Sequence, residues 1–321
     1  MTTYKEAIGT NIEVVSSDPS NPVTGKVWYN TTTDQIKARQ QFIGNAWSSG
    51  GDLNNPKGHG AAAGTQTATL TFGGIDGDDG STELAETELY TGSTWTELND
   101  LNTARKLLGG VGADGTSALA MAGAPALAIN EVWNGTSWTE VGDMNTGRDA
   151  IGSASTATAA IIFGGSDGSN TANTEFFNGT SWTELNNLGT ARYKTTQFGL
   201  QTAAVAAGGD TGTANVNNVE HYDGTSWTAA TVYPSTLTFA ASAGSQTDGL
   251  VFLGDLGPGY GATTNTYDGT SWAASATLAN AGGNTEGDGT GALALAASGG
   301  PSSGRTDGSE EFTGATTALN Y

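Results

Sequence analysis

Arginine recurs at one place in three successive stretches of this chain, as Arg105, Arg148 and Arg192. The planar guanidinium group donates paired hydrogen bonds to carboxylates. Three such groups on one face could bind an acidic sugar or another carboxylate, so Arg105, Arg148 and Arg192 define a candidate ligand face. A structural alternative stays open and is favoured by the periodicity: each arginine could instead hydrogen-bond the carbonyls of its own loop.

An acidic loop with the sequence Asp-Gly-Asp-Asp-Gly begins at Asp76 and offers oxygen ligands of the kind that Ca²⁺ prefers. Asp76, Asp78 and Asp79 are therefore weak candidate calcium ligands. The loop lacks the twelve-residue pattern of an EF-hand, which favours a solvated loop instead. We predict no bound metal and no other cofactor.

The residues that most catalytic sites need are scarce. The chain has no cysteine, which excludes thiolate catalysis and disulfides, and its two histidines, His59 and His221, lie far apart in the sequence. A retaining glycosidase needs two carboxylates about 5 Å apart, and no spacing among the 32 acidic residues singles out such a pair. We predict that the protein is not an enzyme, with a glycan-acting enzyme as the alternative.

The charge balance limits the partners. The net charge is −21, with 32 acidic and 11 basic residues, whereas nucleic-acid binding needs clustered Lys and Arg facing phosphate. We therefore predict no nucleic-acid partner. No run of about 18 apolar residues is present, so we predict no membrane insertion.

A repeated motif organises most of the chain. An aromatic residue is followed two positions later by Gly and five positions later by Trp, as in Tyr90–Trp95. From Tyr90–Trp95 onward, successive copies are 43 to 45 residues apart, a period typical of solenoids and propellers. The other copies are Phe42–Trp47, Trp133–Trp138, Phe177–Trp182, Tyr222–Trp227, Tyr267–Trp272 and a version without Trp that begins at Phe312.

Each period contains four short strand patterns separated by turn residues. In the second repeat we expect strands at 106–113, 117–123, 130–134 and 137–141, and Asn134-Gly135 predicts a two-residue hairpin turn between the last two. That turn would place Trp133 and Trp138 as diagonal neighbours on one face, where we expect them to pack against the next sheet. Four strands per period indicate the blades of an all-β propeller.

These repeats resemble the kelch repeat, in which a strand ends in Gly-Gly and a Tyr and a Trp follow. The doublets are Gly73-Gly74, Gly164-Gly165, Gly208-Gly209 and Gly299-Gly300, and Arg105, Arg148 and Arg192 match the arginine that the family often has before its first strand. The resemblance covers residues 47–321 and implies a kelch-like β-propeller. Strand patterns for the first two positions occur six times, which favours six blades, with seven as the alternative.

The amino-acid sequences of the repeats resemble those of tail-fibre and other structural proteins of marine bacteriophages. Segments 101–105, 64–68 and 178–182 carry this similarity, together with the leader segment 25–33. The resemblance implies a virion protein that is assembled in the host cytoplasm. This leader segment resembles the small module that precedes the variable body in such proteins.

We expect two domains. Residues 1–46 should form a small β meander with strands at 27–30, 36–41 and 42–47, which docks the chain to other virion proteins; an incomplete extra blade is the alternative. Residues 47–321 should form the propeller. The strand that begins at Trp47 could close the ring by covering a weak C-terminal strand near 316–321, since closure removes exposed edges.

Strand alternation places two sets of loops on one face of the ring. These are the loops between repeats and the loops between the second and third strands, whose sequences differ from repeat to repeat. Variable loops on a rigid scaffold are the usual place for recognition, so we expect a host-surface glycan or protein to bind there. The variable loops are 75–86, 125–129, 166–173, 210–217, 256–263 and 301–308.

The sequence therefore favours a bacteriophage virion structural protein, a tail fibre or appendage component, that acts through host-surface recognition or subunit interaction. We expect a homo-oligomer, as in many fibre proteins. An intracellular kelch adaptor is a further alternative, although the chain shows no partner domain of the kind that such adaptors carry.

Overall fold

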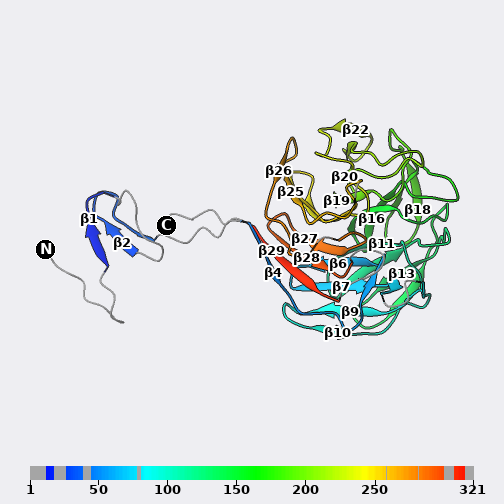
Figure 1. Ribbon diagram of the computed structural model, residues 1–321, viewed down its shortest axis with the longest axis horizontal. Coiled ribbons are helices and arrows are strands. Elements are labelled where there is room, and N and C mark those ends of the chain that lie inside the picture. Colours follow the sequence, from blue (N-terminus) through cyan, green and yellow to red (C-terminus); the bar gives the residue numbers. More distant parts are fainter. Residues whose placement is uncertain are drawn as a thin grey trace. The chain divides into compact units, whose positions relative to one another are not determined.

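The structure is a computed structural model that describes residues 12–17, 27–38, 45–77, 81–257, 259–280, 282–299 and 307–314. All of its regular elements are β-strands, and no helix occurs among these residues. The chain divides into two compact units: Met1–Asn45 together with Gly314–Tyr321, and Ala46–Thr313 (Figure 1).

The larger unit consists of repeated four-stranded antiparallel sheets, an arrangement compatible with a β-propeller. The first sheet contains β6 (Ala61–Thr65), β7 (Ala68–Phe72), β9 (Thr87–Tyr90) and β10 (Trp95–Glu97). The second contains β11 (Gly109–Asp114), β12 (Ser117–Met121), β13 (Asn130–Trp133) and β14 (Trp138–Val141). The third contains β15 (Gly152–Thr156), β16 (Ala159–Phe163), β17 (Thr174–Phe177) and β18 (Trp182–Leu185).

Three further sheets follow in chain order. The fourth contains β19 (Thr196–Leu200), β20 (Ala203–Ala207), β21 (Val219–Tyr222) and β22 (Trp227–Ala230). The fifth contains β23 (Ala241–Ser245), β24 (Asp248–Phe252), β25 (Thr264–Tyr267) and β26 (Trp272–Ala274). The sixth contains β27 (Glu286–Gly289), β28 (Leu293–Ala297), β29 (Ser309–Thr313) and, from the other end of the unit, β4 (Ala46–Ser49).

The sixth sheet joins the two ends of the larger unit. Strand β4 pairs antiparallel with β29, with Trp47 opposite Phe312. The expectation that the strand beginning at Trp47 would pair with a C-terminal strand therefore holds, but the partner is β29; residues 316–321, the expected partner, lie outside the described residues. Trp47 also packs edge to face on Phe252 of the fifth sheet, with ring centroids 4.9 Å apart. This aromatic contact favours the position of Trp47 in the sixth sheet.

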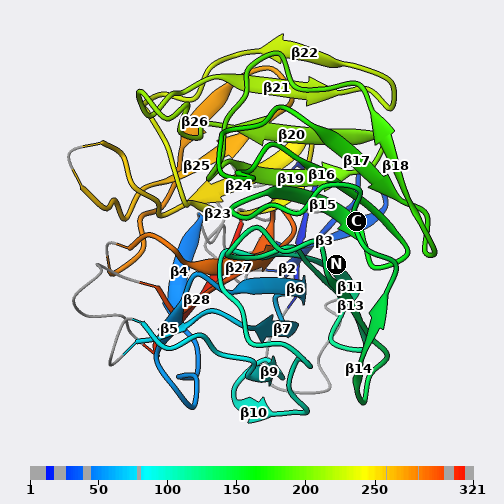
Figure 2. The ribbon, with the colours of Figure 1, turned by 90° about the vertical axis from the view of Figure 1, so that its right-hand side faces the viewer.

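The first strands of the six sheets lie next to one another around a common interior. Strand β6 contacts β11, and the contacts continue through β15, β19, β23 and β27, which in turn contacts β6. Figure 2 shows these first strands near the middle of the unit and the last strands β14, β18 and β22 at its rim. A short separate pairing joins β5 (Lys57–Gly58) to β8 (Ile75–Asp76).

The hairpin between the third and fourth strands differs from the predicted one. Trp133 lies directly opposite Trp138 rather than diagonal to it, because the turn has four residues, 134–137. The Asn134 side-chain oxygen accepts hydrogen bonds from the backbone N–H groups of Thr136 (2.9 Å) and Ser137 (3.0 Å), which stabilises the longer turn. The two indoles still touch, with centroids 5.4 Å apart.

The tryptophans hold each sheet to the preceding one, not to the next as predicted. The Trp138 indole packs on Phe72 of the first sheet and donates a 2.9 Å hydrogen bond to the Thr87 hydroxyl. The indole donors alternate along the chain between such hydroxyls and backbone carbonyls. Trp138, Trp227 and Trp47 donate to Thr87, Thr174 and Thr264, whereas Trp95, Trp182 and Trp272 donate to the carbonyls of Gly51, Gly142 and Thr231.

The smaller unit contains a three-stranded sheet in the order β1 (Glu13–Val15), β2 (Val27–Asn30), β3 (Gln35–Ala38). The antiparallel pair β2–β3 matches the two predicted strands, but β1 adds a parallel neighbour that the sequence did not indicate. Trp47, expected in this meander, belongs to the sixth sheet instead, and residues 39–44 lie outside the described residues.

Candidate functional site

The three recurring arginines lie inside the fold rather than on a ligand face. Arg105, Arg148 and Arg192 have no exposed surface. Each guanidinium pairs with a glutamate on the third strand of the same sheet: Arg105 with Glu131 at 2.5 Å, Arg148 with Glu175 at 2.5 Å and Arg192 with Glu220 at 2.6 Å. Arg105 also donates to the Thr103 carbonyl of its own loop, as the structural alternative expects. Arg148 donates instead to the Asn173 carbonyl of another loop, and Arg192 to the Ala206 carbonyl of β20.

The partner glutamates also hold the loop that leads into each sheet. The second carboxylate oxygen of Glu131 accepts hydrogen bonds from the backbone and side-chain N–H groups of Asn102, both at 2.7 Å. Glu175 does the same with Asn145. Sequence reasoning missed these glutamates, although a signal existed: an acidic residue stands two positions before the aromatic of the repeat in Glu88, Glu131, Glu175, Glu220 and Glu310.

The first repeat has a lysine in place of the arginine. Lys57 is fully buried and its Nζ lies 3.5 Å from Glu88 Oε1. For the arginines, burial lowers the pKa of Arg105 and Arg148 from the ordinary value, with the partner carboxylates acting in the opposite sense. A guanidinium starts from so high a pKa that it keeps its charge. These pairs therefore act as buried structural links.

The acidic loop is only partly described. Asp76 is the last residue of β8 and pairs with Lys57 across a short backbone ladder, whereas Asp78 and Asp79 lie outside the described residues. Within the described ranges, no group of three or more His, Cys, Asp or Glu side chains could hold a metal ion. The two histidines are separate: His221 contacts the Tyr267 hydroxyl at 3.0 Å, and His59 packs edge to face on Phe239.

A ring of six residues, which we call the mouth ring, lies just before the first strands. Its members are His59, Leu107, Ala150, Lys194, Phe239 and Asn284, and all have left-handed backbone conformations with φ between 48° and 61°. Each backbone N–H donates to the carbonyl of the member before it at 2.7 to 3.3 Å, and the His59 N–H donates to the Asn284 carbonyl. The hydrogen bonds thus form a closed cycle.

The six mouth-ring residues share one backbone conformation but have different side chains. A left-handed conformation costs a non-glycine residue about 1 kcal/mol or more, so the surrounding structure must impose it six times. At one place the side chains cluster: the Lys194 ammonium lies 4.4 Å from the Tyr193 ring centroid, 5.1 Å from that of Phe239 and 3.4 Å from Asp210 Oδ2. The ring therefore presents a cation among aromatic faces.

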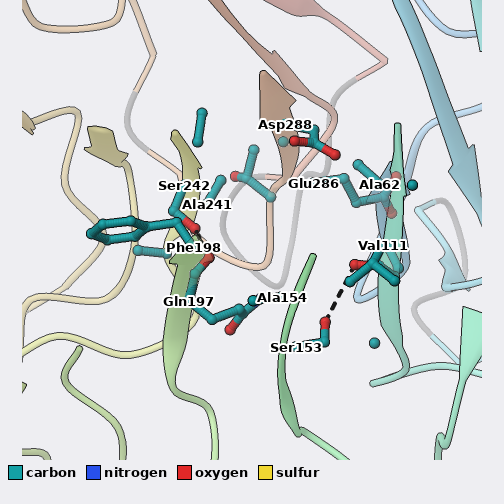
Figure 3. A pocket seen from close by; sticks show the side chains of 18 of the residues that line it. Ala62, Val111, Ser153, Ala154, Gln197, Phe198, Ala241, Ser242, Glu286 and Asp288 are labelled. Carbon is teal, nitrogen blue, oxygen red and sulfur yellow. Dashed lines mark hydrogen bonds between the residues drawn. The ribbon is translucent and has the colours of Figure 1, made fainter. Parts of the chain in front are cut away.

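A cavity of about 140 Å³ lies among the first strands of all six sheets; we call it the axial cavity (Figure 3). It continues into a second cavity of about 90 Å³ at the mouth ring, because both share Gly60, Leu108, Gln197, Ala240 and Thr285. The variable loops lie at the same end of the sheets as the mouth ring. Residues directly before three mouth-ring members form backbone bridges with the starts of these loops: Asp149 with Ser166, Tyr193 with Asp210 and Thr238 with Asp255.

Two acidic side chains of β27 line the axial cavity. Glu286 Oε1 accepts a 3.0 Å hydrogen bond from the Gly60 N–H, and Asp288 accepts hydrogen bonds from the N–H groups of Gly64 (2.7 Å) and Gly289 (2.6 Å). Burial raises the pKa of Glu286 to about 8, although Lys57 and the Gly60 N–H act to lower it. Burial likewise raises the pKa of Asp288 to about 7.

The acids are particular to the sixth sheet. By strand register, Glu286 corresponds to Ala61 and Gly152, and Asp288 corresponds to Ala63 and Ala154, which are small residues packed between sheets. Sequence reasoning did not single out this pair, because only the register shows that Glu286 replaces small residues and that Asp288 replaces uncharged ones.

Two comparisons with known proteins found no match. No family model matches the sequence, and no curated protein matches it either. In the described part of the chain, no helix is long and apolar enough to cross a membrane.

Proposed function

We propose that this protein is a structural component of a bacteriophage particle, a tail fibre or related appendage, which binds the host surface through a closed six-bladed kelch-type propeller. The mouth ring and the variable loops form its binding face, and residues 1–46 dock it to other virion proteins. The identification with phage proteins rests on the resemblance of the repeats and of segment 25–33.

The mouth ring is the observation that carries the binding role. Six equivalent positions share one backbone conformation and one hydrogen-bond pattern, yet their side chains are His, Leu, Ala, Lys, Phe and Asn. If packing alone had set these positions, similar backbones would favour similar side chains, as they do for the buried strands. A constant scaffold with variable side chains is typical of a recognition site.

The side chains suit a ligand with sugar chemistry. The Phe239 ring offers an apolar face, the Lys194 ammonium a positive charge and Asn284 an amide. Aromatic faces with a few convergent polar groups are typical of small binding sites. Lys194 already contacts Asp210 at 3.4 Å, so an acidic group on the ligand would compete with an existing partner.

The docking role draws support from the face of the small sheet. Val14 lies opposite Tyr29, and Tyr29 lies opposite Ile36, so these three side chains form one row, with Val27 on the same face by strand alternation. Val14, Val27 and Ile36 are exposed. Exposed apolar faces mark interaction sites, and residues 1–45, with four basic and four acidic residues, carry none of the net charge of −21.

Binding of labelled protein to host cells tests the binding face. We expect Lys194→Met and Phe239→Ala each to weaken binding about tenfold. Asp223→Asn, in a turn between third and fourth strands at the other end of the sheets, serves as control because Asn134 and Asn178 fill equivalent positions. Equal binding by all variants would contradict the assignment of the face.

Mass spectrometry of purified phage particles tests the docking role. The chain should be present, and Ile36→Lys should lower its copy number, because a charge on the apolar face opposes burial. Thr33→Lys, in the exposed turn of the same sheet, should leave incorporation unchanged. Particles that lack the wild-type chain would overturn the virion role.

A further inference from the structure

The axial cavity has one polar side, formed by residues at the starts of the fourth and sixth sheets. Five side-chain oxygen atoms of residues that line the two cavities have no hydrogen-bond partner among the described residues. Gln197 Oε1, Thr285 Oγ1 and Glu286 Oε2 belong to the axial cavity, and Thr195 Oγ1 and Asn284 Oδ1 to the cavity at the mouth ring. Three of these residues are deeply buried, with exposed fractions of 6% for Thr195, 7% for Asn284 and 2% for Glu286. Buried polar atoms normally have partners, so these oxygens point to a ligand.

Small residues line the cavity on the side of the first and second sheets, among them Ala61, Ala62, Gly110 and Val111. In Figure 3, Glu286 and Asp288 lie on one side of the cavity, with Ser153 and Ala154 across from them. The lining surface is mainly polar.

The donor and acceptor chemistry limits the ligand class. The five oxygens are acceptors or hydroxyls, so they favour a ligand rich in hydrogen-bond donors and disfavour an anion. A cation would meet the Lys57 ammonium, whose charge already acts on Glu286. A polyhydroxylated molecule supplies several O–H donors, and it needs no net charge.

We propose that the axial cavity binds one neutral sugar residue or a comparable polyol, which enters end-on through the mouth ring and hydrogen-bonds Gln197, Thr285 and Glu286. The inference rests on the proposed function, since it names the ligand class for the same face. The cavity of about 140 Å³, extended by about 90 Å³ at the mouth, has the space for a single ring but not for a chain lying flat.

Saturation-transfer NMR on the full-length protein tests this site with defined probes. These are the methyl α-glycosides of glucose, galactose and mannose, N-acetylglucosamine, acetate and ethylammonium. At least one neutral sugar should bind, and Gln197→Leu and Thr285→Val should each weaken it about tenfold, because each removes an unpartnered oxygen of a residue that lines the cavity. Asn186→Leu, an exposed amide on the third sheet, is the matched control.

The outcomes separate this inference from the proposed function. Binding of acetate or ethylammonium alone would overturn the neutral-sugar assignment, as would neutral-sugar binding that both cavity variants leave unchanged. If no probe binds while host cells still bind through Lys194 and Phe239, the cavity proposal fails and the binding face stands. If host binding is also insensitive to those two residues, the proposed function fails independently.

Discussion

The backbone N–H of His59 donates a 3.2 Å hydrogen bond to the carbonyl of Asn284, which joins the segment before the first sheet to the segment before the sixth. The same relationship links each of the other neighbouring pairs in the mouth ring. Side-chain contacts repeat it further out: Gln66 donates to the Ala294 and Phe312 carbonyls of the sixth sheet, just as Gln246 donates to the Ala204 and Tyr222 carbonyls of the fourth. The first and sixth sheets therefore contact each other in the same way as two sheets that are consecutive in the chain.

The closing tryptophan should contribute strongly to stability. Trp47 packs on Phe252 and Phe312 and donates a 2.9 Å hydrogen bond to Thr264, so Trp47→Ala should cost about 3–5 kcal/mol in the free energy of unfolding. Urea unfolding followed by far-UV circular dichroism measures this. Trp28→Ala, in the smaller unit, should leave the main transition in place; equal effects of the two variants would refute the role of Trp47.

The Arg148–Glu175 link should behave as a buried ion pair. Arg148→Met alone leaves the Glu175 carboxylate buried without its cation and should cost about 3–5 kcal/mol in unfolding free energy. Arg148→Met combined with Glu175→Leu removes both charges and should recover part of the loss. A double-mutant cycle in urea measures the coupling, and purely additive losses would show that the two charges do not depend on each other.

Stability should fall as pH rises because of two acids in β27, the buried Glu286 and the half-buried Asp288. The pKa of Glu286 rises to about 8 and that of Asp288 to about 7 on folding, so the folded state holds protons that the unfolded state releases. Their contribution is fully present below about pH 4 and is lost as pH rises through 7 and 8. Glu286→Gln and Asp288→Asn should therefore raise the melting temperature at pH 9 more than at pH 5.

Differential scanning calorimetry across this pH range provides the measurement. Asp248→Asn, in the neighbouring fifth sheet, is the control, since Asp248 is exposed. If Glu286→Gln destabilises the protein equally at both pH values, the carboxyl is not the protonated group that the burial implies.

The repeat period and the turn chemistry were enough to predict much of the fold. The motif that ends in Trp138, with its strands at 117–123 and 130–134, predicted a four-stranded unit, and the structure has β12 and β13 there. The hairpin register was wrong, because Asn134-Gly135 fits both a two-residue turn and the observed four-residue turn. The Asn134 hydrogen bonds within the turn and the packing of Trp138 against Phe72 both accompany the observed register.

The candidate site was harder to predict. Periodicity favoured a structural role for Arg105 over a ligand contact, but its partner Glu131 lies 26 positions away in the sequence and was not identified. The mouth ring has no sequence signature, because its left-handed backbone is imposed on residues as different as Leu107 and Lys194. Glu286 becomes notable only when strand pairing aligns it with small residues in the other sheets.

Disulfide trapping tests the proposed closed ring most directly, because the chain has no cysteine of its own. Ser49 lies opposite Glu310 across β4 and β29, and the Gly50 N–H to Ser309 carbonyl bond places Ser49 and Glu310 at a non-hydrogen-bonded pair, where side chains are closest. Ser49→Cys with Glu310→Cys should form an intramolecular disulfide readily, visible by non-reducing electrophoresis and peptide mapping. Ser49→Cys with Glu311→Cys, shifted by one residue to the opposite face, should not. Failure of the first pair, or equal bridging by the second, would contradict the closed ring and with it the mouth ring and the axial cavity.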